Sequence, residues 1–270
     1  MSARVTLTAA ATAAIAVLLA TALPAAASTG ARTFASCVTN DGNACAGYIA
    51  SGAQFQQITN VAFLRDPVQY SAITNGIGWQ DSLRAGTAWD VIVGISNGTS
   101  PFGSLYSPAF LVYHNGSLEP GAPETNNAQW CPVGQPCEPA SLGGGFPVGD
   151  TVTETVTYAR TEGTVNVSAR DVAGDLFKGF FPVGPGISFG QARIEAGYGS
   201  FSPPAGVTRL VRITGAGVTL YNGKKFSLAA WFTHNKELAT SNGTGSGTLQ
   251  ASPTDLESGG TAFSVNFEHP

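Results

Sequence analysis

The chain has 270 residues, a net charge of −4 and only 11% charged residues, together with 34 glycines. This acidic balance offers no basic surface for nucleic acid and none for anionic lipid. Aromatic and β-branched residues are too frequent for a disordered chain. The composition therefore predicts a folded, turn-rich protein whose partners include neither nucleic acid nor a membrane.

Residues 1–27 have the features of an export signal. Arg4 precedes an apolar stretch from Ala9 to Leu23, and Ala25-Ala26-Ala27 offers the small residues at which such signals are cleaved. The apolar stretch is too short and too alanine-rich for a membrane span, which needs about 20 apolar residues. We expect a secreted, extracellular protein, and the alanine-rich signal favours a bacterial source.

The remainder, 28–270, is long enough for one large β domain with a sizeable core. We expect a single domain that is a monomer. The Pro/Gly-rich stretch from Glu119 to Gly145 is the best candidate for a domain boundary. It contains a pair of cysteines, however, so we interpret it as a long, disulfide-stapled surface loop.

The four cysteines fall into two close pairs. In an exported chain we expect disulfides, and proximity favours two small loops among the three possible connectivities: Cys37 with Cys45, and Cys131 with Cys137. A metal site is disfavoured because neither pair has zinc-ligand spacing. The histidines also lack metal-binding spacing, and they are His114, His234 and His269. We expect no metal and no cofactor.

Segments of period-two alternation, separated by Gly, Asn, Asp and Pro turns, predict antiparallel strands with one wet face. An Asn222-Gly223 pair predicts a hairpin turn. The fold class is therefore all-β, a two-sheet antiparallel β-sandwich. The expected strands are Ala46–Ala50, Phe55–Phe63, Ala88–Ile95, Ala109–Tyr113, Thr151–Tyr158, Thr164–Ser168, Arg193–Glu195, Phe226–Phe232 and Thr261–Phe267.

A succession of short motifs adds a family to this fold class. The motifs are Cys45–Gly52 running into Phe55, Gly76–Gly78, Leu83–Trp89, Tyr106–Tyr113, Gly149–Val152 and Ile194–Ala196. Read in this order, they resemble the eqolisins, the glutamic peptidases with a concanavalin A-like (jelly-roll) sandwich. The resemblance covers nearly all of the chain after the signal.

The resemblance implies a site made of one Glu and one Gln. Glu195 matches the Glu that acts as general base on water and later as acid, because a carboxyl can move protons. The motif from Leu83 has Arg84 where the family has the Gln that stabilises the oxyanion. An Arg84–Glu195 ion pair in an inactive site is the favoured interpretation. Gln80 precedes Arg84 by four residues and would share its face on a regular strand, so it could replace the amide.

Aromatic residues could line a groove for an extended ligand, and core packing is the alternative for each. The candidates are Tyr113, Trp89, Trp130 and Trp231. A glycosidase is disfavoured because Glu195 has no second carboxylate nearby. We expect the other acidic residues in turns or on solvent-facing sheet surfaces, namely Asp150, Glu154, Asp171 and Asp175.

Three functions follow. The first is a peptidase homologue with lost or altered activity that binds an extended peptide or a polysaccharide on its concave face. The second is an active acid endopeptidase that uses Glu195 with Arg84 or Gln80. The third is a structural or adhesive surface module.

Overall fold

A computed structural model describes residues 43–64, 77–97, 105–119, 128–140, 144–199, 206–230, 234–239 and 250–269. These residues form strands and turns, arranged as two antiparallel sheets. The predicted two-sheet β-sandwich is confirmed. In the same residues no helix is long and apolar enough to cross a bilayer. The expected signal 1–27, Cys37 and Trp231 lie outside the described residues.

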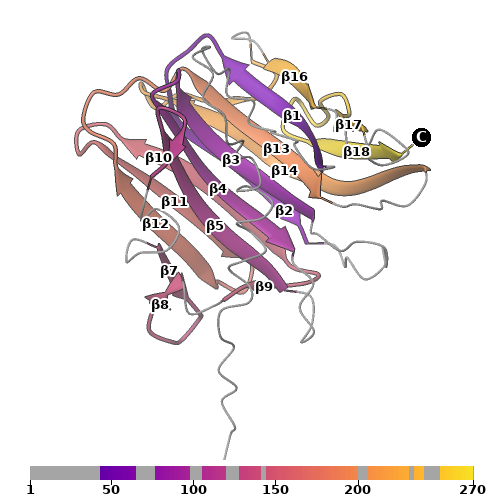
Figure 1. The fold of residues 1–270 in the computed structure, drawn as a ribbon, viewed down its shortest axis with the longest axis horizontal. Helices are drawn as coiled ribbons and strands as arrows, with labels where there is room; N and C mark the ends of the chain where they lie inside the picture. Colours follow the sequence, from indigo (N-terminus) through magenta and orange to yellow (C-terminus); the bar gives the residue numbers. More distant parts are fainter. Residues whose placement is uncertain are drawn as a thin grey trace, which may run out of the picture.

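Sheet A has eight strands in the order β16-β1-β13-β3-β4-β5-β6, with β9 beside β5. Figure 1 shows its centre, where β1, β3, β4 and β5 run diagonally across the molecule. The strands of this sheet are β1 (Asn43–Ser51), β3 (Ile77–Ala85), β4 (Trp89–Asn97), β5 (Leu105–His114), β6 (Ser117–Leu118), β9 (Phe146–Pro147), β13 (Gln191–Gly199) and β16 (His234–Ala239).

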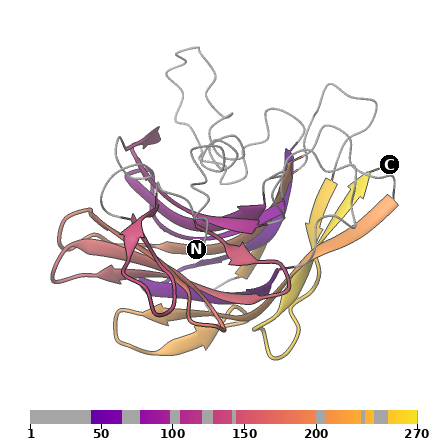
Figure 2. The same ribbon diagram turned by 90° about the horizontal axis from the view of Figure 1, so that it is seen from below.

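Sheet B has ten strands in the order β17-β18-β14-β2-β10-β11-β12-β7-β8, with β15 beside β14. It lies against sheet A as the second layer of the sandwich (Figure 2). Its strands are β2 (Phe55–Phe63), β7 (Ala128–Cys131), β8 (Glu138–Pro139), β10 (Thr151–Ala159), β11 (Thr164–Asp171), β12 (Leu176–Pro182), β14 (Gly206–Leu220), β15 (Lys225–Ser227), β17 (Gln250–Pro253) and β18 (Phe263–His269).

The core fills the space between the sheets because alternate residues of each strand point inward. Sheet A contributes Tyr48, Leu83 and Ile194, each at most 1% exposed. Sheet B contributes residues such as Ile58 and Val156, which are fully buried. Every second residue of sheet A therefore points away from sheet B. We call that surface the outer face of sheet A.

Most predicted strands are present, and β2 covers the predicted range Phe55–Phe63 without change. The Asn222-Gly223 hairpin is also confirmed, because Gly223 has φ 78° and links β14 to β15. The strand predicted over Phe226–Phe232 is confirmed at Phe226 and Ser227 and is wrong over residues 228–230. Strand β15 ends at Ser227, and a turn follows in which Ala230 N–H donates to the Ser227 carbonyl at 3.2 Å.

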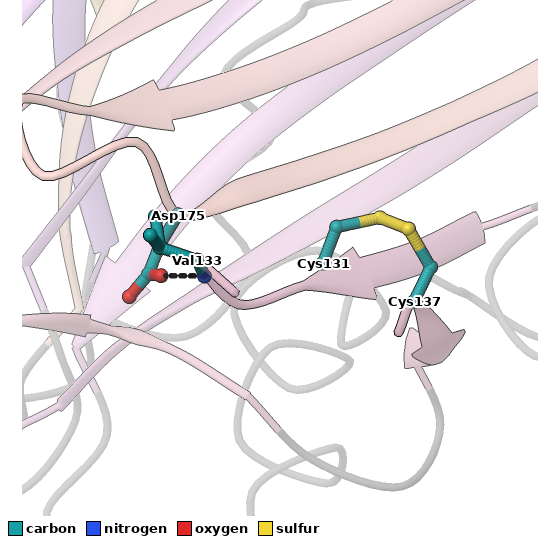
Figure 3. The surroundings of a disulfide bond; sticks show 4 residues. All are labelled: Cys131, Val133, Cys137 and Asp175. Carbon is teal, nitrogen blue, oxygen red and sulfur yellow. Dashed lines mark hydrogen bonds between the residues drawn. A yellow bond between two sulfur atoms is a disulfide. The ribbon is translucent and has the colours of Figure 1, made fainter. Parts of the chain in front are cut away.

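The stretch predicted as a stapled surface loop is partly built into sheet B. The Cys131–Cys137 disulfide is present and closes a loop between β7 and β8. Strand β7 also pairs with β12. Beside the disulfide, the Val133 N–H donates to Asp175 Oδ1 at 2.7 Å, which ties the loop to the turn before β12 (Figure 3). The described part of the stretch, residues 128–140, therefore lies at an edge of sheet B.

Strand β1 approaches β13 closely at a glycine. Gly47 pairs with Glu195, and a Cβ added to Gly47 would overlap the Ile194 carbonyl oxygen and lie 2.7 Å from Glu195 Cα. Those neighbours are backbone atoms, which cannot move aside as a side-chain tip can. Only glycine fits this register.

Gly47→Ala is expected to lower the free energy of unfolding by roughly 1–3 kcal/mol, the usual cost of overpacking. Urea unfolding followed by tryptophan fluorescence measures the change. Gly190→Ala is the matched control, because a Cβ there meets nothing within 4 Å. Equal midpoints for the Gly47 variant and the parent protein would contradict the close approach of β1 and β13.

Candidate functional site

The outer face of sheet A carries polar side chains on its two central strands, β13 and β3. Because Ile194 and Leu83 are buried in the core, the residues of opposite parity point outward. These residues are Gln191, Arg193 and Glu195 on β13 and Gln80, Ser82 and Arg84 on β3. The antiparallel register places the two rows side by side.

Glu195 and Gln80 are direct cross-strand partners. The Gln80 side-chain amide Nε2 donates a hydrogen bond to Glu195 Oε2 at 3.0 Å. Glu195 is 1% exposed, whereas Gln80 is half-buried. The structure thus brings together an amide and a carboxylate that the sequence analysis named as candidates. Their chemical roles remain predictions.

Arg193 supplies a cation to the same carboxylate. Its Nη1 lies 3.6 Å from Glu195 Oε1, and both side chains are at most 6% exposed. Its Nη2 donates to Gln191 Oε1 at 3.0 Å. Since buried charges are costly unless paired, the guanidinium stabilises the charged form of Glu195. Sequence analysis missed Arg193, although its place two residues before Glu195 puts it on the same face of the strand.

Arg84 is not the partner of Glu195. It lies opposite Gln191, four residues along β3 from the partner of Glu195. That separation is about 13 Å along the strand. Arg84 Nε instead lies 3.6 Å from Asp90 Oδ2, in a pair whose side chains are 5% and 7% exposed. The expected Arg84–Glu195 ion pair is therefore wrong.

The motif that led to Arg84 is also not one strand. Strand β3 ends at Ala85, Gly86 adopts φ +56° in the turn, and β4 begins at Trp89. A tight turn needs this positive φ, which glycine adopts without steric cost. The motif Leu83–Trp89 therefore spans the end of β3, a turn and the start of β4, and the assignment of Arg84 to the Gln position stays a prediction.

Tyr113 lies on the same face as Arg84, at the end of the sheet away from Glu195. It pairs with Asp90 across β4 and β5 and is half-buried. Burial raises the pKa of the Tyr113 phenol, and the negative charge of Asp90 raises it further. Tyr113 therefore stays neutral and can offer its hydroxyl to a ligand that reaches this end.

The described tryptophans do not line this face. Trp89 has the opposite parity to Asp90, stacks on the His114 ring at 4.1 Å and packs near Phe181 of sheet B. Trp130 is only 8% exposed and packs edge-on against Phe146. Both predicted ligand contacts are replaced by packing inside the sandwich, because large aromatic rings gain most from burial.

The described residues contain no group of three or more His, Cys, Asp or Glu that could hold a metal ion. His114, the histidine with a described side chain, lies 3.1 Å from Glu119 Oε1 through its Nδ1. The described residues of the outer face of sheet A offer carboxylates, amides, guanidinium groups and the hydroxyls of Ser82 and Tyr113.

The fold is similar to that of solved glutamic peptidases. Scytalido-glutamic peptidase, solved with a peptide-based transition state analog, matches with a TM-score of 0.50 and 14% identity over 86% of this chain and 100% of that chain. SCP-B, a member of the Eqolisin family in a complex with a tripeptide, matches with a TM-score of 0.45 and 14% identity, over 86% of this chain and 100% of that chain. Aspergilloglutamic peptidase from Aspergillus niger matches with a TM-score of 0.43 and 12% identity, over 72% of this chain and 99% of that chain.

No family model matches the sequence, and neither does any curated protein. At 14% identity, the likeness to the scytalido-glutamic peptidase establishes the fold alone. The eqolisin-like sandwich expected from the motifs is confirmed at this level.

The buried ion pair on β13 gives a test of the site's electrostatics. Arg193→Met should lower the free energy of unfolding by about 3–5 kcal/mol, because it leaves the Glu195 charge buried beside an apolar side chain. Adding Glu195→Gln to that variant should recover part of the loss. Urea unfolding of the four proteins of this double-mutant cycle measures the coupling. Additive losses would show that the two side chains do not interact.

Proposed function

We propose that this chain is an exported peptidase homologue with lost or altered activity that binds an extended peptide across the outer face of sheet A. The observation that carries the proposal is the state of Glu195. Its carboxylate accepts from Gln80 on one oxygen and faces Arg193 on the other. The peptidase-like sandwich provides the scaffold. We expect weak or absent cleavage because both oxygens of the Glu195 carboxylate already face other side chains.

A general base in peptide hydrolysis must reach a water molecule, take its proton and later donate a proton to the leaving amine. Glu195 is 1% exposed. A nearby guanidinium favours the ionised form of a carboxyl group, and an ionised carboxylate cannot act as a proton donor. The same groups that hold Glu195 in place therefore oppose its use as an acid.

An extended peptide suits this face better than a glycan. Gln191 and Gln80 carry amides and are half-buried, so they can pair with the carbonyl and N–H groups of a peptide backbone. Glycan binding would favour exposed aromatic rings, but Trp89 and Trp130 face the sandwich interior. The scytalido-glutamic peptidase of similar fold was solved with a peptide-based analog. That likeness supports the peptide by analogy.

Export rests on the predicted signal at residues 1–27 and is supported by the Cys131–Cys137 disulfide, which needs an oxidising compartment. We therefore propose that the protein acts outside the cytoplasm, and its monomeric state stays a prediction.

One observation favours a second candidate, an acid endopeptidase with Glu195 as the base. Gln80 lies 3.0 Å from Glu195 and has an amide that could donate to an oxyanion. For this reaction Gln80 would have to release the carboxylate so that water can bind between the two side chains. Arg84 takes no part, since it pairs with Asp90.

Denatured casein should remain uncleaved from acid to neutral pH when incubated with the purified protein, because Glu195 is held as a partnered carboxylate. Gel electrophoresis and mass spectrometry of the digests measure cleavage. Glu195→Gln and Gln80→Ala are the site variants. Glu138→Gln and Gln129→Ala are controls of the same chemistry at exposed positions. Acid cleavage that disappears in both site variants and persists in both controls would establish the endopeptidase instead.

Peptide binding is tested separately. Gln191→Trp places a bulky side chain on the outer face of sheet A and should weaken binding of unfolded casein peptides on the order of tenfold by blocking the surface. Calorimetric titration measures the affinity. Thr157→Trp, on sheet B, is the matched control and should leave affinity unchanged. Binding to a glycan array with no peptide binding would contradict the assignment of the ligand.

A further inference from the structure

A second acidic cluster lies in the core of the sandwich, between the two sheets. Asp81 of β3 faces Glu154 of β10 and Asn60 of β2, and all three residues are 0% exposed. Asn60 Nδ2 donates to Asp81 Oδ1 at 2.6 Å and to Glu154 Oε2 at 3.3 Å. One amide nitrogen therefore bridges two carboxyl groups across the interface of the sheets.

The carboxyl groups have spare oxygens. Asp81 Oδ2, Glu154 Oε1 and Asn60 Oδ1 are buried, and each lacks a hydrogen-bond partner. Two carboxylates and an amide oxygen would place only acceptors at these positions. A proton on either acid would turn an acceptor into a donor, so the geometry favours protonated acids.

Among the described residues, no cation faces the cluster. Arg84 and Arg193 of sheet A lie on the outer face. The basic side chains of β11 and β12, Arg170 and Lys178, are exposed on the far side of sheet B. The remaining titratable groups that face inward from the packed strands are neutral or acidic, namely Tyr48 of β1, Tyr106 of β5, Tyr158 of β10 and Asp171 of β11.

Burial without a cation disfavours the charged form of both acids. Desolvation raises the pKa of Asp81 well above its ordinary value, and the Asn60 hydrogen bond opposes that shift only in part. Desolvation also raises the pKa of Glu154, and the negative charge of Asp81 raises it further, whereas the side chains of Asn60 and Trp79 act as donors that oppose this shift only in part. Both shifts agree with the geometry of an uncharged pair.

We propose that Asp81 and Glu154 form a proton-holding pair that makes the folded sandwich acid-adapted, stable while the pair is protonated and progressively less stable as it ionises. In its ionised form the pair would place two negative charges between the sheets with one amide to separate them. Mutual repulsion and the demand for water would then favour opening of the interface between β3 and the β2–β10 pair.

The pair is also placed to transmit its state to the outer face. Asp81 directly follows Gln80, and its cross-strand partner Ile194 directly precedes Glu195. A displacement of β3 at Asp81 would therefore also move Gln80 and change the geometry of the Gln80–Glu195 hydrogen bond. The proposal does not depend on what that contact does, because the stability effect belongs to the core.

The direction of the pH dependence follows from proton binding. In the unfolded chain both acids titrate near their ordinary pKa of about 4. Above that pH the folded state binds more protons than the unfolded state, so raising the pH destabilises the fold. The protonated pair contributes its full stabilisation below the pKa that the two acids have in the unfolded chain. This stabilisation is lost as the pH rises through the raised pKa that they have in the folded protein. The unfolding equilibrium constant should rise up to about tenfold per pH unit for each proton held.

Urea unfolding of the purified protein across acid and neutral pH tests the proposal. The parent protein should lose stability as the pH rises, and Asp81→Asn combined with Glu154→Gln should remove most of that slope while keeping the shapes of both side chains. Glu162→Gln, at an exposed turn, is the control and should keep the full slope. A double variant with the parent's slope would overturn the proposal.

A measurement on the parent protein covers the case in which the double variant does not fold. Infrared spectroscopy in heavy water at mildly acidic pH, just above the ordinary carboxyl pKa of about 4, should show the carbonyl stretch of a protonated carboxyl group in the folded state, lost on unfolding in urea. The absence of that band from the folded protein would refute the proton-holding pair without any substitution.

Discussion

The pairing of β3 with β13 decides what both faces of sheet A contain. In the observed register Gln80 lies opposite Glu195 on the outer face, and Asp81 lies opposite Ile194 on the core side. Side chains alternate along a strand, so a slip of one residue in β3 would exchange these positions. It would move Asp81 to the outer face and push Gln80 between the sheets. The candidate site and the buried acids are therefore two consequences of one register.

Alternation predicted the fold because it depends only on neighbouring residues in a strand. The segment Thr151–Tyr158 shows this, since its inward positions Val152, Val156 and Tyr158 are all fully buried. The same pattern also contained a signal that the sequence analysis did not use. Glu154 has the parity of those core residues, but it was assigned to a turn or a wet face. It is fully buried, so that prediction was wrong.

Asp171 caps a turn as predicted, for a local reason, although its side chain is buried. Asp171 ends β11, and its Oδ1 accepts from the N–H groups of Gly174 and Asp175 at 2.7 and 2.8 Å. Such a turn is specified by a few consecutive residues. The partners of Glu195 are different, because Gln80 comes from a strand 115 positions away in sequence. Alternation along β13 is enough to place Arg193 on the same face as Glu195. Only the register between the distant strands β3 and β13 shows that Gln80, and not Arg84, lies opposite Glu195.

The acid on the outer face of sheet A and the two acids in the core are stabilised in opposite ways. Glu195 faces Arg193, and the attraction between them requires the carboxylate to be charged. Asp81 and Glu154 share an amide without a cation, so their arrangement requires protons. Strong acid weakens the outer pair, and rising pH weakens the inner one. The fold then satisfies both arrangements together only where the pH is low enough to keep the core acids protonated and high enough to keep Glu195 charged.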